Sequence, residues 1–241
     1  MAKYEYKGRS KIITEIPKRK PKKAKQTIDN CCFLLLSAYP LAGVKKLGCP
    51  LSNDYYEDEV MNLHLDLIYE VCKTPFISVV GGFDIKRILK HPRRNEFQII
   101  ENTLFEFTNS SEDLRIGLNG IPRAPTVIVD AAFLPSVETY RSLLKDPNDS
   151  KIIYSTRESD CVGCNLTKEG LVNFFGYACP HKTKGAYILS VSDIDRIKKK
   201  MLGSTFNKNK FDYEILDELR LIGVEDLSKS LRLDENYGIS D

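Results

Sequence analysis

The run FISVVGGFDIKRILKH, at residues 76–91, sets the pattern for the whole chain. Its first five residues are mostly apolar, as is typical of a buried strand, and the chain then turns at Gly81 and Gly82. The residues that follow have helical spacing. Further along, the apolar strand TVIV closes on Asp130 after another helix-like run. This alternation predicts an α/β fold with a mostly parallel, Rossmann-like sheet covered by helices on both faces.

The alternation of strand-like and helix-like runs continues along the chain. Strands are expected at 31–38, 76–80, 97–100, 126–130, 151–156 and 186–189, and helices at 54–72, 85–89, 111–118, 137–144, 193–202 and 211–222. A β-hairpin is expected over residues 162–175, because a polar turn with glycine separates two apolar runs. We expect Ser110 or Ser111 to cap the third helix and Ser192 the fifth, with Gly223 ending the last helix.

The charge is uneven along the 241 residues. The net charge is +3, yet residues 1–26 hold ten Lys or Arg and two Glu, a net charge of +8. This segment contains proline and has no apolar periodicity, so we expect an extended or disordered basic arm before a domain at residues 27–227. A polar tail at residues 228–241 follows. The arm is either a solvated tail or a segment that lies on an acidic protein surface or a nucleic-acid backbone.

The composition argues against several classes of protein. No apolar run approaches the ~20 residues of a membrane-spanning helix, and the N-terminus does not resemble a secretory signal. Seven cysteines, odd in number and irregularly spaced, do not suggest a disulfide framework. We therefore expect a protein of a reducing compartment, the cytoplasm, with no membrane partner.

Five short segments follow one another in the order found in a known enzyme family. They are Val80–Asp84, Glu101–Asn102, Thr108–Leu114, Lys184–Ser190 and Phe211–Glu214. Together they resemble the sugar-phosphate and choline-phosphate nucleotidyltransferases over roughly residues 31–223. The resemblance implies a GT-A-type fold and Mg²⁺ as cofactor. It also implies transfer of a nucleotidyl group from a nucleoside triphosphate to a sugar phosphate or phosphoalcohol.

The loop after the first strand departs from that family. It reads LSAYPLAGVKKLGCPL at residues 36–51 and lacks the family's Gly-x-Gly, with Tyr39 at a glycine position and Leu51 at a lysine position. Glycine lets backbone approach a phosphate closely, so Tyr39 would hinder a phosphate grip. The second hypothesis is therefore a catalytically inactive relative that serves as a binding or structural subunit. Such a subunit could belong to a virus or phage assembly, and so to a virion, tethered by its basic arm.

Three acids are the candidate metal ligands. Asp130 ends an apolar strand at the carboxyl edge, where open α/β sheets bind ligands, and we assign it as a catalytic and metal-binding residue. An Asp that only caps a turn is the alternative. The resemblance implies that Asp212 or Glu214 completes the Mg²⁺ site, although both also suit the first turn of a helix.

Binding of the nucleotide's phosphates requires nearby cations and a backbone that can approach the phosphates closely. We expect Lys46 to be a catalytic cation and Lys45 a phosphate contact, unless both lysines are simply solvated. The resemblance implies further nucleotide contacts at Gly43, Gly81, Asn102 and Asn109. For the two asparagines, a turn-forming role is equally compatible with the sequence.

The chain also carries side chains of the types that bind zinc, namely Cys161, Cys164, Cys179 and His181. If the hairpin is correct, Cys161 and Cys164 are three residues apart on one strand and point to opposite faces. The sequence leaves the choice between a zinc site and separate core residues open.

Overall fold

The computed structural model describes residues 30–40, 50–52, 59–156, 162–203, 206–228 and 230–232. The expected basic arm lies outside the described residues, and so do Gly43, Lys45, Lys46 and Cys161. The predictions that concern these residues stay predictions.

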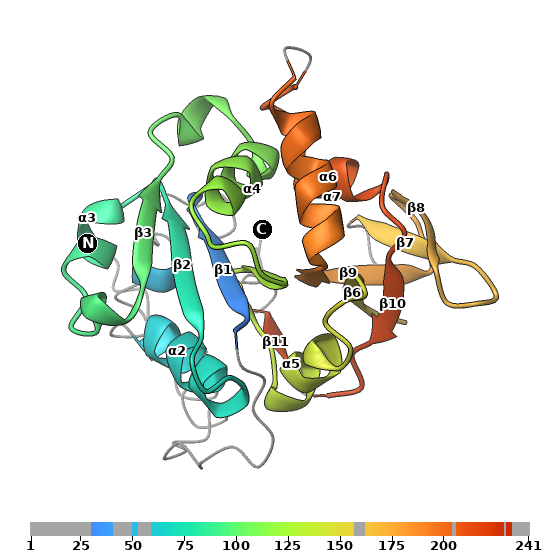
Figure 1. Cartoon of the computed structure of the whole chain (residues 1–241), viewed down its shortest axis with the longest axis horizontal. Helices are drawn as coiled ribbons and strands as arrows, with labels where there is room; N and C mark the ends of the chain where they lie inside the picture. Colours follow the sequence, from blue (N-terminus) through green and yellow to red (C-terminus); the bar gives the residue numbers. More distant parts are fainter. Residues whose placement is uncertain are drawn as a thin grey trace, which may run out of the picture.

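A nine-stranded sheet forms the centre of the described chain, in the order β10-β6-β9-β4-β1-β2-β3, with β7 paired to β9 and β8 paired to β7 (Figure 1). The strands on this path are β1 (Cys32–Ser37), β2 (Phe76–Gly81), β3 (Gln98–Glu101), β4 (Thr126–Asp130), β6 (Lys151–Ser155), β9 (His181–Leu189) and β10 (Ile222–Glu225). β1 pairs in parallel with both β2 and β4, and β2 pairs in parallel with β3. β9 runs antiparallel to β4 and β6, and β10 is parallel to β6. The predicted mostly parallel sheet is confirmed.

Two antiparallel strand pairs lie off this path, a hairpin within the same sheet and a separate two-stranded sheet. The predicted hairpin is present as β7 (Gly163–Leu166) and β8 (Val172–Gly176), which are antiparallel, and β7 also pairs with β9. Gly170 has φ 77° in the turn, a conformation that favours glycine. Near the other end of the chain, β11 (Leu231–Arg232) pairs antiparallel with β5 (Phe133–Leu134).

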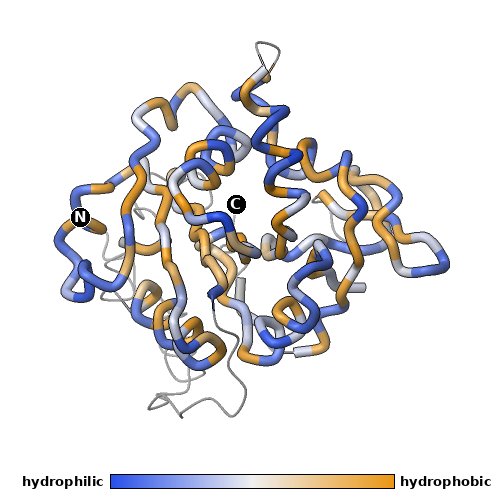
Figure 2. Tube along the Cα trace, viewed as in Figure 1, coloured by the Kyte–Doolittle hydropathy of each residue, from blue (hydrophilic) through white to orange (hydrophobic). Residues whose placement is uncertain are grey.

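Helices cover both faces of the sheet, as predicted. Their bounds are α2 (Glu59–Val71), α3 (Ile85–Leu89), α4 (Ser110–Asn119), α5 (Val137–Leu144), α6 (Val191–Met201) and α7 (Asp212–Leu216). Alternate residues of β1 point to opposite sides because side chains alternate along a strand. Phe33 and Leu35 enter a core with α2, α3 and α5, whereas Leu34 and Leu36 enter a core with α4, α6 and α7. Figure 2 shows the corresponding apolar colouring of the central strands.

The last predicted helix was wrong over half of its length. Residues 211–222 were expected to form one helix, but α7 ends at Leu216 and Ile222 begins strand β10. Hydrogen-bonded pairing with β6, which is distant in sequence, overrides the local helical spacing. Gly223 does not cap a helix. A β carbon there would lie 2.9 Å from Leu166 Cδ2, so the glycine allows β10 to pack closely on the hairpin.

The predicted helix caps were also wrong. Asn109, and not Ser110 or Ser111, is the N-cap residue of α4, and its side chain makes no capping hydrogen bond. Ser190 caps α6 in place of Ser192, and its hydroxyl accepts a hydrogen bond from the Asp193 N–H. These two helices start one and two residues earlier than expected.

Gly117 fixes how closely α4 approaches the sheet. A β carbon at this position would lie 2.7 Å from Leu34 Cδ2 and 3.0 Å from Val80 Cγ2, in a fully buried layer. We expect Gly117→Ala to lower the free energy of unfolding by about 1–3 kcal/mol through overpacking, as measured by urea denaturation. Gly176→Ala is the matched control, since the nearest atom there is 3.7 Å away. Equal stability of the two variants would contradict the tight packing of α4.

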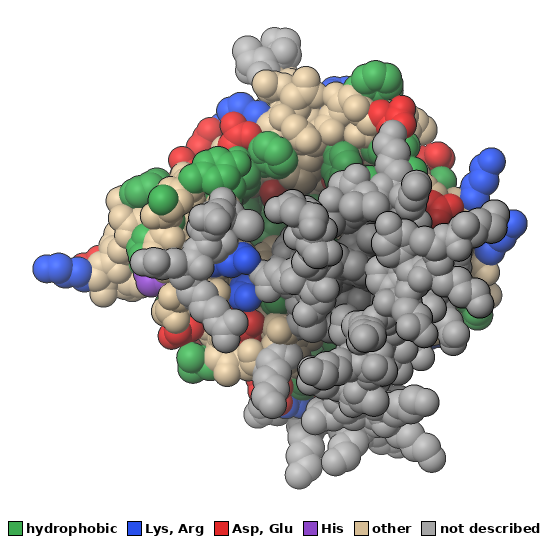
Figure 3. Space-filling view, turned by 180° about the vertical axis from the view of Figure 1, so that it is seen from behind, with side chains coloured by type: hydrophobic (Ala, Val, Ile, Leu, Met, Phe, Trp, Pro, Cys, Tyr) green, Lys and Arg blue, Asp and Glu red, His purple; other side chains and the backbone are tan. Residues whose placement is uncertain are grey.

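Within the described ranges, no helix is both long and apolar enough to cross a bilayer. On the side of the molecule that Figure 3 shows, acidic and basic side chains are interspersed over the visible described surface.

Candidate functional site

The candidate site lies at the carboxyl edge of the parallel strands. β1 is flanked by β2 on one side and β4 on the other, so the order of strands along the chain reverses beside β1. Ligands of open α/β sheets bind outside the carboxyl ends of the strands at such a switch point. The residues that end the four parallel strands here are Ser37, Gly81, Glu101 and Asp130.

Asp130 ends β4 at this edge and is held by its own turn. Its Oδ1 accepts a hydrogen bond of 3.0 Å from the Ala132 N–H, which fixes the rotation of the carboxylate. By strand alternation Asp130 shares a face with Ile128, which packs in the core formed with α4, α6 and α7. The carboxylate is therefore directed to the side of the sheet on which α4 and α7 lie.

Asp212, the first residue of α7, is brought to the same place. Its Oδ1 accepts a hydrogen bond of 3.1 Å from Ser110 of α4, and its Oδ2 accepts one of 3.1 Å from Tyr187 of β9. Burial raises the pKa of Asp212, these hydroxyls oppose the rise, and the nearby charge of Asp130 adds to it. The two predicted carboxylates are thus electrostatic neighbours, and the charge of Asp130 disfavours the ionised form of Asp212.

This pair of carboxylates suits Mg²⁺, which typically takes one or two protein carboxylates together with phosphate oxygens. A bound cation would relieve the repulsion between Asp130 and Asp212. Glu214 has a different role, because its Oε2 accepts a hydrogen bond of 2.8 Å from the Phe211 N–H at the start of α7. Across the part of the chain that the structure describes, no three His, Cys, Asp or Glu side chains form a group that could hold a metal. Phosphate oxygens would have to complete the coordination.

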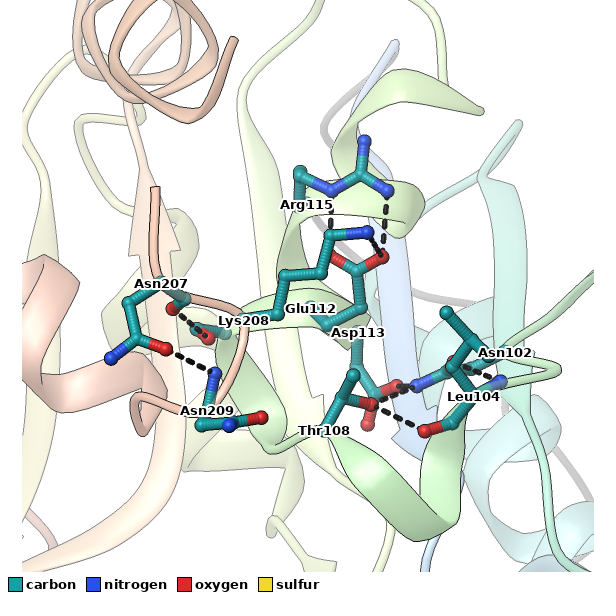
Figure 4. Close-up of polar contacts among 10 residues, drawn as sticks. Asn102, Leu104, Thr108, Glu112, Asp113, Arg115, Asn207, Lys208 and Asn209 are labelled. Atoms are coloured by element: carbon teal, nitrogen blue, oxygen red, sulfur yellow. Dashed lines mark hydrogen bonds and ion pairs between the residues drawn. The ribbon is translucent and has the colours of Figure 1, made fainter. Parts of the chain in front are cut away.

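Asn102 lies in a buried polar network beside the site (Figure 4). Its Nδ2 donates to Asp113 Oδ1 at 2.7 Å and to Thr108 Oγ1 at 3.1 Å, and its Oδ1 accepts from the Leu104 N–H at 3.0 Å. The side chain is 3% exposed. Asn102, which was predicted to contact the nucleotide, thus stabilises the loop between β3 and α4.

Asp113 is the acidic member of this network and is also nearly inaccessible. Its burial raises its pKa to about 7, while the hydrogen bond from Asn102 opposes the rise. The Oδ2 atom has no hydrogen-bond partner among the described residues. Tyr39, which follows β1, donates its hydroxyl to the Thr108 carbonyl at 2.8 Å. The network therefore joins the end of β1 to the start of α4.

Asn109 is engaged with the loop that precedes α7. Its Nδ2 donates to the Asn209 carbonyl at 2.6 Å, and its backbone N–H donates to the Lys208 carbonyl at 3.0 Å. Figure 4 shows that Lys208 also reaches Glu112, which forms a two-pronged ion pair with Arg115. The first turn of α4 is thus covered by the chain that carries Asp212 into the site.

The glycine turn at the end of β2 allows neighbouring segments of the chain to approach its backbone closely. The Gly81 carbonyl accepts a hydrogen bond of 2.7 Å from the Asn102 N–H. A β carbon at Gly82 would lie 2.8 Å from both the Ala38 carbonyl oxygen and Phe105 Cβ, so no larger residue fits there without a shift. Leu51, which replaces the family's lysine, is 2% exposed in the core and does not face the site.

The described zinc candidates are Cys164 of β7, Cys179 of the turn between β8 and β9, and His181 of β9. A β carbon at Gly163 would lie 3.1 Å from Cys179 Cβ, which places Cys179 on the Gly163 side of β7. Cys164 pairs across strands with His181, so these two side chains share the opposite face. The described members of the set do not converge on one zinc ion.

The hydrogen bonds that Tyr187 and Ser110 donate to the Asp212 carboxylate were not predicted from the sequence. Tyr187 lies in a segment that the resemblance singled out, but only the register that sets it opposite Ile128 shows that it reaches the site. The sequence carries no local signal of that pairing.

Comparison with known proteins finds solved structures that share the fold of this chain. No protein-family model matches the sequence, and no curated protein matches it either. The CTP:phosphocholine cytidylyltransferase of Streptococcus pneumoniae aligns with a TM-score of 0.66 at 11% identity, over 86% of this chain and 96% of that chain. For the inositol-1-phosphate CTP transferase of T. maritima the TM-score is 0.64 at 11% identity, over 83% and 86%.

A UDP-glucose pyrophosphorylase bound to UDP-glucose also has a TM-score of 0.64, at 13% identity, over 87% of this chain and 96% of that chain. At such low identity these likenesses concern the fold and not the substrates. The chain has the fold of the sugar-phosphate and choline-phosphate nucleotidyltransferases.

Proposed function

We propose that the chain is a Mg²⁺-dependent nucleotidyltransferase that acts on a nucleoside triphosphate and a phosphorylated sugar or alcohol. The observation that carries the proposal is the hydrogen bond from Tyr187 to Asp212. Tyr187 lies opposite Ile128, on the face of the sheet that Asp130 shares, so both carboxylates lie on this face near the carboxyl edge. The likeness in fold to nucleotidyltransferases supports the same reading.

The roles follow from the chemistry of the reaction. A phosphate oxygen of the acceptor attacks the α-phosphorus, the bond to the bridging oxygen of the β-phosphate breaks, and pyrophosphate leaves. Mg²⁺ held by Asp130 and Asp212 would neutralise charge on the phosphate oxygens. Ser110 and Tyr187 keep the Asp212 carboxylate in place by donating to its two oxygens.

The remaining nucleotide contacts are proposed from the sequence. Lys46 would face the α-phosphate or the leaving pyrophosphate, and Lys45 would lie against the other phosphates. Gly43 and Gly81 would allow the phosphates or the base to approach the backbone. The Asn109 and Asn102 side chains would contribute by fixing the loops around the nucleotide, since each is hydrogen-bonded within the protein.

Release of pyrophosphate tests the proposal. The full-length protein is incubated with each of the four nucleoside triphosphates and with sugar 1-phosphates, phosphocholine or glycerol phosphate, with and without Mg²⁺. We expect one combination to release pyrophosphate, and only with Mg²⁺. No release from any combination, together with no thermal stabilisation by any triphosphate, would contradict the proposal.

A second candidate is the non-catalytic relative. Tyr39 favours it, because this side chain stands where the family has glycine and is tied to Thr108 at the rim of the site. A subunit of this kind would bind its partner through the basic arm. The same experiment separates the two candidates, since the second predicts neither pyrophosphate release nor Mg²⁺-dependent stabilisation.

A further inference from the structure

His64 lies behind the end of β4 as a polar side chain in an apolar layer. It belongs to α2 and is 0% exposed. Its Nε2 lies 3.2 Å from the Ala131 carbonyl oxygen, and its Nδ1 has no hydrogen-bond partner among the described residues. Because a carbonyl oxygen can only accept, Nε2 carries the proton. The ring is thus a neutral donor with a single hydrogen bond.

Keeping this histidine in the core has a cost. A buried ring nitrogen without a hydrogen-bond partner lowers the stability of the fold, because it has lost its hydrogen bonds to water. The neighbouring core residues of the same helix, Leu65 and Ile68, are fully buried and apolar, and they show what this layer otherwise contains. The hydrogen bond to Ala131 is therefore the contribution that an apolar side chain at this position could not make.

That hydrogen bond completes the fixation of the turn after Asp130. The Ala131 N–H donates to the Leu36 carbonyl at 2.9 Å, which ties the turn to β1. The Ala131 carbonyl accepts from His64. The Ala132 N–H then donates to Asp130 Oδ1 at 3.0 Å. His64 thus fixes the carbonyl of the peptide group between Ala131 and Ala132. The N–H of the same peptide group orients the Asp130 carboxylate.

The two sides of the sheet cooperate in this arrangement. Ala131 packs in the core formed with α2, α3 and α5, whereas Asp130 is directed to the side of α4 and α7. We propose that His64 is a positioning residue for Asp130: from the opposite side of the sheet it fixes the Ala131 peptide and so holds the Asp130 carboxylate ready for a divalent cation. The inference rests on the proposed function, because it requires Asp130 to bind the cation.

Two variants of similar polarity test the inference. In His64→Gln the amide nitrogen can occupy the place of Nε2 and donate to Ala131, whereas in His64→Asn the amide ends near the place of Nδ1 and is too short. Binding of Mn²⁺ alone is measured by electron paramagnetic resonance for the wild type, both variants, Asp130→Asn and Leu65→Ala. We expect His64→Asn to weaken Mn²⁺ binding roughly tenfold or more, as loss of an outer partner of a metal ligand does, and His64→Gln to retain the wild-type affinity.

Leu65→Ala controls for stability, because it opens a cavity in the same layer and removes no hydrogen bond to the turn. It should lower the melting temperature and leave the Mn²⁺ affinity unchanged. Suppose that Asp130→Asn abolishes Mn²⁺ binding. The inference is then overturned if His64→Gln and His64→Asn bind Mn²⁺ with equal affinity, or if His64→Asn and Leu65→Ala lose the same amount of Mn²⁺ affinity. If Asp130→Asn binds Mn²⁺ as the wild type does, or the wild type binds none, the proposed metal role fails and the inference fails with it.

Discussion

Asp130→Asn is expected to lower kcat for nucleotidyl transfer roughly a thousandfold, equivalent to about 4 kcal/mol of transition-state stabilisation. The asparagine keeps the size of the side chain and the Oδ1 acceptor for the Ala132 N–H, so the turn should persist. What is lost is the negative charge that would hold Mg²⁺ against the phosphates. The measurement is the rate of pyrophosphate release at saturating substrate and Mg²⁺.

Asp195→Asn is the matched control for this prediction. Asp195 lies on α6, where it forms an exposed ion pair with Arg123. Its replacement should leave kcat unchanged, because exposed ion pairs contribute little. An Asp130→Asn protein that unfolds as the wild type does and keeps its full kcat would exclude Asp130 as the cation ligand.

Asp113→Asn is expected to raise the free energy of unfolding by up to about 4 kcal/mol at pH 8 and to leave it unchanged near pH 3. Burial raises the pKa of Asp113 to about 7 from a usual value of 3.8. The unfolded chain releases this proton above about pH 4, whereas the folded protein keeps it up to about pH 7. Stability contributed by the protonated carboxyl is therefore lost as the pH rises through this window, and asparagine removes that loss.

The geometry makes the substitution conservative. Asparagine still offers Oδ1 to the Nδ2 of Asn102, and the Oδ2 atom that it replaces has no described hydrogen-bond partner. Urea denaturation at pH 3, 6 and 8 measures the effect. A stability difference between Asp113→Asn and the wild type that does not grow with pH would show that the Asp113 carboxyl is not held neutral in the fold.

His64 has the opposite pH dependence and must be separated from Asp113. Burial lowers the pKa of His64 from 6.5 to about 4, so the folded protein resists a proton that the unfolded chain takes up. This contribution to stability is present above pH 6.5 and is lost as the pH falls towards 4. In Asp113→Asn only the His64 effect should remain of these two, and stability should rise with pH between about 4 and 6.5.

Much of the fold could be predicted from the sequence because its signals are local. Continuous apolar runs such as that of β1, the glycine of the hairpin turn and the Asp at the end of β4 all lie within single elements. β10 could not be predicted, because Ile222 and its neighbours have helical spacing and become a strand only by pairing with β6. Asp212 was found through a resemblance, and the structure adds that Ser110 and Tyr187 orient it.

The roles of the asparagines show the limit of prediction at the site. Asn102 and Asn109 lie beside the expected nucleotide, yet their hydrogen bonds are made within the protein. What decides this is the burial of Asp113 and the path of the loop before α7, both of which depend on contacts between distant segments. A residue type and its spacing indicate that an amide is present, but they do not indicate which partner it has.

The most direct test of the central claim is a crystal structure of the protein soaked with Mn²⁺ and, in turn, the α,β-methylene analogues of ATP, CTP, GTP and UTP. Anomalous scattering at the manganese edge locates the ion. We predict a peak bound by Asp130 and Asp212, with metal–oxygen distances of about 2.1–2.2 Å and the remaining ligands supplied by phosphate oxygens and water. An analogue bound with its Mn²⁺ elsewhere on the protein, and with no peak between these two carboxylates, would contradict it.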